Sequence, residues 1–176
     1  SQEDKCELEF VERLLEVLEP RGLAVAVVPM SCAIGTKFKE VRERLFKYHT
    51  LKAVFSMPDD IFYPTGTNVC VMVWEANKPN AGRKTWFGYF KDDGFEKRKH
   101  QGRIDARGKY KSSIRDKWIS AYQNGEEIAG LSVKYEVKYD DEWCAEAYME
   151  TDYNAITDDI FVAKLREYAS YLIGKE

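Results

Sequence analysis

The stretch Met57-Pro-Asp-Asp-Ile-Phe-Tyr-Pro-Thr-Gly-Thr-Asn-Val-Cys-Val-Met-Val-Trp74 joins a turn to a strand. Two prolines and a glycine interrupt its first half, and the apolar run from Asn68 to Trp74 predicts a buried strand. Its polar residues gather at the entrance of that strand, beside the aromatic side chains of Phe62 and Tyr63. A stretch of this kind is typical of the rim of a pocket.

The chain before this stretch alternates between helical and strand patterns. Four-residue spacing places Phe10, Leu14 and Leu18 on the apolar side of a first helix, with Cys6, Val11 and Leu15 alongside them. The continuous apolar run that follows is typical of a strand covered on both faces. The patterns predict helices at 4–20 and 36–48 and strands at 23–28 and 51–56. This order indicates an α/β fold with crossover connections.

The chain after this stretch begins with a further strand. We expect the strand at 84–90 to pair with the strand at 68–74 as an antiparallel hairpin, because a clear turn separates them. Residues 91–110 are polar and punctuated by glycine, which predicts a loop or an extended arm.

The last third of the chain predicts two helices and an exposed strand. The first helix ends near Gly125, and alternation of apolar and polar residues over 133–139 indicates the strand. Thr157 is a candidate cap for a final helix. The apolar stripe of that helix consists of Phe161, Leu165, Tyr168 and Leu172.

Charge is unevenly distributed, although the formal net charge is only −3. Residues 78–117 hold 13 basic and 5 acidic side chains, whereas residues 126–176 hold 5 basic and 13 acidic ones. A basic block is a plausible phosphate-facing surface. The alternative is that the two blocks neutralise each other or simply face solvent.

The composition excludes several classes of protein. With 176 residues, 44% of them hydrophobic, the chain is a globular domain, with or without an appendage. It has no apolar run of roughly 18–20 residues, as a membrane span requires, and no secretory signal at residues 1–9. Its four widely spaced cysteines are typical of reduced, buried thiols rather than of a zinc site.

The residues by themselves contain no complete catalytic centre. No glycine-rich phosphate loop is present, and adjacent carboxylates such as Asp59 and Asp60 fit turns or helix starts better than an acid–base couple. His49 lies at a predicted helix end, where we expect a structural role. His100 lies among basic residues, where we expect a phosphate-facing or solvated position.

Several segments resemble the adenine-N6 DNA methyltransferases, above all the modification subunit of type I restriction–modification systems and related fused restriction–modification enzymes. The most specific is Pro58 to Val69, and the others are 10–22, 24–35, 42–45 and 51–55. The resemblance covers about residues 5–95. It implies the C-terminal half of a Rossmann-like methyltransferase sheet, with its antiparallel terminal hairpin, at 1–95. A basic linker and a small, acidic α+β extension would follow at 96–176.

The chain departs from this family in what it lacks. Such enzymes need a glycine-bearing loop for S-adenosylmethionine and an Asn/Asp-Pro-Pro-Tyr/Phe motif, and neither is in the sequence. In the family both lie N-terminal to the matching region. The resemblance therefore implies a fragment without catalytic residues of its own. The isolated chain would be inactive, and the cofactor would be bound by the parent protein.

The resemblance also implies a place for the target base, which such enzymes flip out of the duplex and stack on aromatic side chains. Trp74 is the preferred stacking residue, followed by Tyr63 and Phe62, although Phe62 and Trp74 could instead be core residues. The loop beside the base would consist of Thr65, Gly66 and Thr67, with Gly66 supplying a positive φ.

The basic block would then follow the DNA backbone or meet a partner. The candidates are Lys97, Arg98, Lys99, Arg103, Arg107, Lys109 and Lys111. The resemblance implies DNA and a specificity subunit as partners, with a restriction subunit as a further candidate. It also implies a place in the prokaryotic cytoplasm and no contact with a membrane.

Two other functions stay open at this point. The chain could be a non-catalytic module for binding nucleic acid or protein that retains the half-fold. Methylation of RNA or protein is a further alternative, because it uses the same fold.

Overall fold

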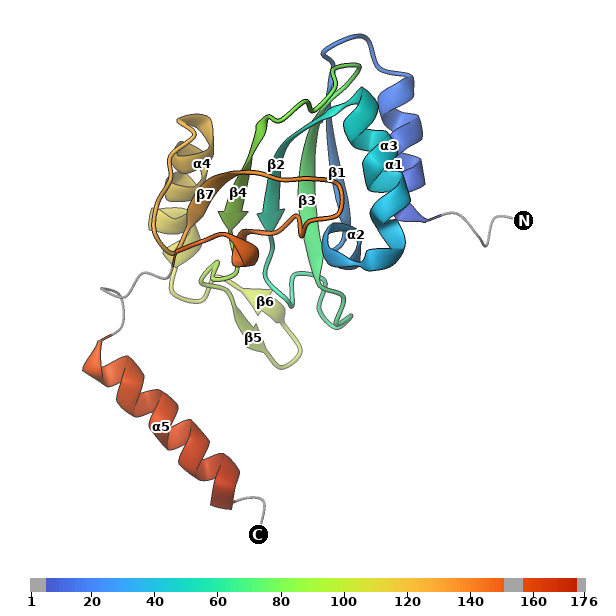
Figure 1. Ribbon diagram of the computed structural model, residues 1–176. Helices are drawn as coiled ribbons and strands as arrows, with labels where there is room; N and C mark the ends of the chain where they lie inside the picture. Colours follow the sequence, from blue (N-terminus) through green and yellow to red (C-terminus); the bar gives the residue numbers. More distant parts are fainter. Residues whose placement is uncertain (1–5, 151–156, 174–176) are drawn as a thin grey trace.

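The computed structural model describes residues 6–150 and 157–173 (Figure 1). A mixed sheet of five strands has the order β1-β3-β2-β4-β7. A separate two-stranded ribbon is formed by β5 and β6. The strands are β1 (Leu23–Pro29), β2 (Thr50–Ser56), β3 (Val69–Glu75), β4 (Lys84–Tyr89), β5 (Glu96–Arg98), β6 (Gly102–Ile104) and β7 (Ser132–Glu136).

The helices flank this sheet or extend from it. They are α1 (Glu7–Glu16), α2 (Ser31–Ile34), α3 (Lys39–Tyr48), α4 (Arg115–Gln123) and α5 (Asp158–Ile173). A π-helical turn at Tyr110–Ile114 leads into α4. The order of helices and strands confirms the predicted α/β alternation over the first half of the chain. No helix among the described residues is long and apolar enough to cross a membrane.

The position of β3 differs from the expected hairpin. Instead of pairing with β4, β3 lies between β1 and β2 and is antiparallel to both. β4 pairs with β2 in parallel and with β7 in antiparallel orientation. The predicted pairing of 68–74 with 84–90 is therefore wrong. Six of the seven residues of β3 are buried, as is typical of a strand in the interior of a sheet.

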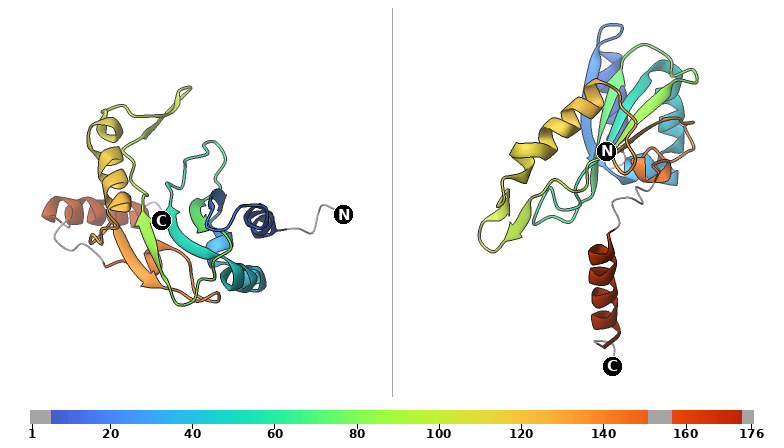
Figure 2. Two further views of the ribbon diagram at one scale, coloured as in Figure 1. Left: turned by 90° about the horizontal axis from the view of Figure 1, so that it is seen from above. Right: turned by 90° about the vertical axis from the view of Figure 1, so that its left-hand side faces the viewer.

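Helices α1 and α3 cover one face of the sheet, as the view from above in Figure 2 shows. The buried side of α1 consists of Leu8, Val11 and Leu15, whereas Phe10 and Leu14 are exposed. The predicted apolar side is therefore confirmed for Val11 and Leu15 and wrong for Phe10 and Leu14. The contacts follow a mixed three- and four-residue spacing that begins at Leu8, which places Phe10 on the outer side.

Helix α4 covers only part of the other face. Its residues Trp118 and Tyr122 pack against Phe55, Trp86 and Phe90 of the sheet region, with the rings of Phe90 and Trp118 stacked at 4.3 Å. The residues of β1 that point to this face are exposed: Leu23, Val25 and Val27. The expectation that this strand is covered on both faces is wrong for the described residues, because α4 lies over β2 and β4.

Residues beyond position 95 complete the same core. β7 extends the main sheet, and the Trp143 ring stacks on Phe46 of α3 at 4.6 Å. Val137 and Ala145 belong to the same buried cluster as α1 and α3. The proposed boundary at residue 95 does not coincide with a break in this core.

Helix α5 lies apart from the sheet in Figures 1 and 2. Thr157 accepts a hydrogen bond from the Ile160 N–H at 3.4 Å, so it caps the helix as the sequence predicts. The predicted apolar stripe is exposed along its length, at Phe161, Leu165, Tyr168 and Leu172.

Candidate nucleic-acid interface

The loop at 57–68 leaves the carboxyl end of β2 and enters β3. Successive turns shape it: the Tyr63 N–H donates to the Asp60 carbonyl at 3.0 Å and the Thr65 N–H to the Phe62 carbonyl at 2.8 Å. These turns leave the side chains of Phe62 and Tyr63 half exposed, at 50% and 52%. Thr65 and Thr67 are exposed as well. The alternative that Phe62 belongs to the core is wrong.

The β5–β6 ribbon is fastened to this loop by a central arginine. The guanidinium of Arg103 lies 2.9 Å from a carboxylate oxygen of Asp60 and donates to both carboxylate oxygens of Asp93, at 2.9 and 3.0 Å. It also lies 5.2 Å from the ring centroid of Phe95. Both bonds to Asp93 come from the same Nη2 atom. Charge-assisted contacts are stronger than neutral hydrogen bonds, so Arg103 holds the ribbon to the loop through Asp60 and to the preceding segment through Asp93.

A second contact brings a cation to the exposed aromatic residues. The Lys97 ammonium lies 3.2 Å from Asp60 and 5.7 Å from the ring centroid of Tyr63. Figure 1 shows the ribbon beside the loop at the lower edge of the sheet. The structure thus joins two sets of residues that the sequence presented separately, the aromatic loop and the basic block.

A third set of contacts anchors the start of the loop. Lys91 forms an ion pair with Asp59 and lies 3.9 Å from Glu146, which accepts a hydrogen bond from the Ser56 hydroxyl at 2.6 Å. The sequence pattern predicts only a turn or a helix start for Asp59 and Asp60. The signal that could have shown these contacts is their position, directly between a strand and an aromatic pair in a chain with one basic block.

Six of the seven cations predicted to meet the DNA backbone are exposed: Lys97, Arg98, Lys99, Arg107, Lys109 and Lys111. Arg98 and Arg107 each pair with Glu96, at 3.6 and 2.9 Å. Exposed pairs of this kind contribute little stability, so a phosphate can replace the carboxylate at small cost. Arg103 is the exception, because its side chain is only 12% exposed. Its guanidinium is already paired with Asp60 and Asp93, which favours a role in holding the loop over a phosphate contact.

Trp74 is not part of this surface. It is fully buried, and its ring packs edge-on against those of Phe46 and Trp143 at 6.3 and 5.7 Å. It also lies near the far end of β3, about 17 Å from the loop at a rise of roughly 3.4 Å per residue. The preferred stacking residue of the sequence analysis is therefore a core residue.

Gly66 lies in the loop without the expected backbone strain. The glycines with positive φ in the described ranges are Gly82, Gly94, Gly102, Gly108, Gly125 and Gly130, so Gly66 does not adopt that conformation. A Cβ atom built at Gly66 has no heavy atom within 4 Å. The prediction of a required positive φ is wrong, and the position is open to solvent.

The described residues do not fit a methyl-donor site. A cofactor loop needs glycines that let the backbone approach the ligand where a parallel strand leads into a helix. β1 leads into α2 through Met30, and none of the positive-φ glycines lies between β1 and β2.

The two histidines differ in burial, and His49 has the structural position that the sequence predicts. It is buried, and its Nδ1 accepts a hydrogen bond from the Asn77 N–H at 3.1 Å. Burial lowers the pKa of His49, against opposing effects of Glu12 and Glu16. It therefore has a structural role, whereas His100 is exposed at the tip of the ribbon. Within 6–150 and 157–173 no three His, Cys, Asp or Glu side chains gather as metal ligands.

Comparison with known proteins identifies the family. The model of the N-6 DNA Methylase family matches residues 1–162. The type II restriction enzyme and methyltransferase RM.BcgI of Heyndrickxia coagulans is 31% identical over 171 residues, covering 94% of this chain and 26% of that protein. The chain thus spans about a quarter of the length of this relative.

Solved structures share the fold. The type I restriction–modification methyltransferase subunit of Streptococcus thermophilus has a TM-score of 0.60 at 20% identity, over 75% of this chain and 27% of that one. A modification subunit of a putative type I restriction enzyme from Vibrio vulnificus has a TM-score of 0.56 at 16% identity, over 73% of this chain and 27% of that one. A chain from a structural study of complex assembly in the type I restriction–modification system has a TM-score of 0.59 at 20% identity, over 96% of this chain and 37% of that one. On the family match, this chain belongs to the N-6 DNA methylases.

Proposed function

We propose that this chain is part of an S-adenosylmethionine-dependent DNA adenine-N6 methyltransferase of a restriction–modification system, located in the prokaryotic cytoplasm. Within it, the chain forms one wall of the base-binding cleft and a surface for the DNA backbone. One observation carries the proposal: Arg103 holds an exposed aromatic loop against a basic ribbon through Asp60, and the Lys97 ammonium of that ribbon lies beside Tyr63. A base and its flanking phosphates need these two kinds of surface side by side.

The aromatic side chains would hold the flipped adenine. Tyr63 and Phe62 are half exposed, so each has ring surface free for stacking on a base. The ammonium of Lys97 beside Tyr63 is placed to contact the phosphate next to that base. Thr65, Gly66 and Thr67 remain candidates for contacts around the base, because the loop presents them to solvent.

The catalytic groups and the methyl donor would come from the remainder of the longer protein. When bound there, S-adenosylmethionine supplies the methyl group, and the residues of this chain hold the acceptor. We propose that the preceding half of the sheet pairs with the outer edge of β1. It would also cover the exposed residues Leu23, Val25 and Val27. The length of RM.BcgI, of which this chain matches about a quarter, supports this proposal.

DNA, a specificity subunit and a restriction subunit are the proposed partners. One structural neighbour comes from a study of complex assembly in a type I system, and RM.BcgI is both a restriction enzyme and a methyltransferase. These descriptions support a multi-component assembly for the protein to which this chain belongs.

The test is base flipping by the longer protein with Tyr63→Ala or Phe62→Ala, measured with a fluorescent adenine analogue. We expect a loss of about 1–3 kcal/mol in stabilisation of the flipped base for the residue that stacks on it. Tyr139→Ala is the matched control, because Tyr139 is also exposed but lies outside the loop. Unchanged flipping and methylation in both loop variants would refute the assignment.

Binding of S-adenosylmethionine distinguishes the methyltransferase from the alternative, a non-catalytic module. We expect the longer protein to bind S-adenosylmethionine in calorimetry, with tighter binding when DNA is present. A longer protein that binds DNA but gives no heat with the cofactor would favour the module.

A further inference from the structure

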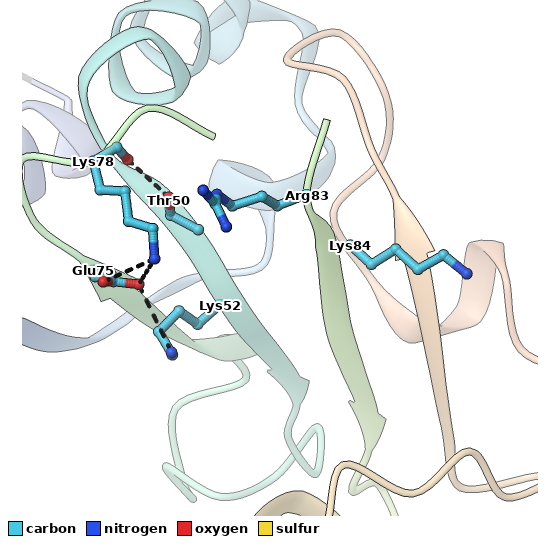
Figure 3. A pocket seen from close by; sticks show the side chains of 6 residues that line it. All are labelled: Thr50, Lys52, Glu75, Lys78, Arg83 and Lys84. Carbon is cyan, nitrogen blue, oxygen red and sulfur yellow. Dashed lines mark hydrogen bonds and ion pairs between the residues drawn. The ribbon is translucent and has the colours of Figure 1, made fainter. Parts of the chain in front are cut away.

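A second basic surface lies at the opposite end of the sheet from the loop. Its pocket of about 380 Å³ is shown in Figure 3. It is formed where β2 begins, β3 ends and β4 begins, and is lined by Thr50, Lys52, Glu75, Lys78, Arg83 and Lys84. The loop at 57–68 joins the other ends of β2 and β3. The two surfaces are therefore separated by about 20 Å, the length of a seven-residue strand.

The backbone around this pocket is held rigidly by buried polar side chains. The Thr50 hydroxyl donates to the Lys78 carbonyl at 2.7 Å, and the Thr85 hydroxyl donates to the Leu51 carbonyl at 2.9 Å. The buried Asn80 accepts a hydrogen bond from the Leu51 N–H at 3.2 Å. These contacts fix the turn between β3 and β4, so the cations that flank it stand on a preformed frame.

The single carboxylate of the pocket is already surrounded by cations. Glu75 is 7% exposed and lies 2.9 Å from Lys78, 3.2 Å from Arg21 and 3.8 Å from Lys52. Hydrogen bonding from Lys78 is the main reason why the pKa of Glu75 is lowered, so this carboxylate stays ionised. Figure 3 shows the ammonium groups of Lys52 and Lys78 directed at it.

The remaining charge is not balanced. Within the described residues Arg83 and Lys84 have no ion-pair partner, although Glu136 lies opposite Lys84 in β7. Lys52 and Lys84 also line an adjoining pocket of about 420 Å³, to which Lys134 contributes a further cation and no residue contributes a carboxylate. The two pockets together present five cations and one carboxylate.

We propose that this double pocket binds phosphate groups, either of a nucleic-acid backbone or of a free phosphate ion. Arg83 offers a planar fork that fits two phosphate oxygens, with Lys52 and Lys78 across the pocket from it. Lys84 is directed away from Arg83 in Figure 3 and supplies a point charge to the adjoining pocket. A concave surface with an excess of positive charge also concentrates anions from solution. The site does not depend on methyl transfer and is distinct from the loop and ribbon.

The test uses the full chain and the triple variant Lys52→Gln/Arg83→Gln/Lys84→Gln. Calorimetry with inorganic pyrophosphate reports on free phosphate, and anisotropy of a labelled DNA duplex at several salt concentrations reports on backbone contacts. We expect the variant to lose the pyrophosphate heat. We also expect its slope of log affinity against log salt to fall by about 2–3, since each contact contributes about 0.9.

The control is Lys37→Gln/Lys47→Gln/Lys138→Gln, which removes three exposed cations elsewhere. If the triple variant loses only the pyrophosphate heat, the pocket binds free phosphate. If its salt slope for the DNA duplex is reduced, whether or not the pyrophosphate heat is also lost, the pocket binds the nucleic-acid backbone. The proposal is overturned if the triple variant equals wild type in both measurements, or if the control loses as much as the triple variant.

Glu75→Gln provides a second test with the opposite sign. Removing this carboxylate frees Lys52 and Lys78, so we expect pyrophosphate to bind about fivefold more tightly. Circular dichroism checks that the variant is folded. Weaker binding by a folded Glu75→Gln chain would contradict direct contact between these cations and phosphate.

Discussion

Two glycines show how the surroundings of a single residue determine what a substitution costs. Gly66 and Gly88 both lack a positive φ. A Cβ atom at Gly66 meets nothing within 4 Å, whereas one at Gly88 lies 2.6 Å from the ring of Trp86. The sequence marks both only as glycine, and the difference arises from a ring that packs over β4.

We predict that Gly66→Ala changes the free energy of unfolding by less than about 0.5 kcal/mol, because the site is open. Gly88→Ala should destabilise the chain by about 1–3 kcal/mol, because the Trp86 ring must move. Urea denaturation of both variants checks this pair. Equal effects would show that the packing at Trp86 is not as described. Since Gly66→Ala is structurally neutral, any effect of it on DNA binding would report a direct contact.

His49 predicts a pH dependence of stability. Burial lowers its pKa in the folded chain, so below about pH 6.5 the unfolded chain binds more protons at this site. Stability should therefore fall as the pH drops from about 7 to 5, since protonation of Nδ1 also removes the acceptor for the Asn77 N–H. We expect His49→Gln to cost on the order of 1 kcal/mol at pH 7 and to flatten this fall.

The measurement for His49 is denaturant unfolding across that pH range, with His100→Gln as the control. His100 is exposed, so the control should keep the full pH dependence. A His49→Gln profile parallel to wild type would show that another group causes the effect.

At the level of elements, the β5–β6 ribbon depends on contacts with other segments. Its strands are three residues each, too short to be stable as an isolated hairpin. Arg103 links it to Asp60 in the loop and to Asp93 in the segment before it. The ribbon and the loop are therefore expected to be ordered together or not at all.

We predict that Arg103→Gln destabilises the chain by about 1–3 kcal/mol, because it leaves the largely buried carboxylate of Asp93 without its cation and leaves Asp60 with Lys97 alone. Lys97→Gln is the matched control in the same ribbon. Its side chain is 54% exposed, so its loss should change stability by less than about 0.5 kcal/mol. Hydrogen exchange should show faster opening of 96–104 in Arg103→Gln only. Similar exchange in the two variants would contradict the conclusion that Arg103 holds the ribbon to the loop.

At the level of the whole molecule, the sheet is covered on one face and partly bare on the other. Helices α1 and α3 cover the first face, and α4 covers the second over β2 and β4. Apolar residues of β1 remain in contact with solvent on the second face, with Val25 62% exposed. An apolar row beside an unpaired strand edge is typical of a surface that another part of a protein covers.

We predict that Val25→Lys changes the free energy of unfolding little in the chain described here and lowers it strongly in the longer protein. In the short chain the lysine faces water, so stability should change by less than about 0.5 kcal/mol. In the longer protein, where we propose that the preceding half-sheet covers β1, a buried unpaired charge should cost several kcal/mol. Thermal unfolding of both proteins measures this, with Tyr48→Lys as a control on the outer side of α3. Equal tolerance in both would rule out a covered β1.

The sequence by itself determined the local elements and the family resemblance, because periodicity, capping and turn residues act over short distances. The strands at 51–56 and 68–74 and the cap at Thr157 follow from such local patterns, whereas the exposure of Phe62 was left open by the sequence. Only the tertiary structure decided the insertion of β3 between β1 and β2, the burial of Trp74 and the structural role of Arg103. Each of these depends on long-range partners, namely strand edges, rings and carboxylates that folding brings together from distant segments. Spacing along the chain carries no information about which of them meet.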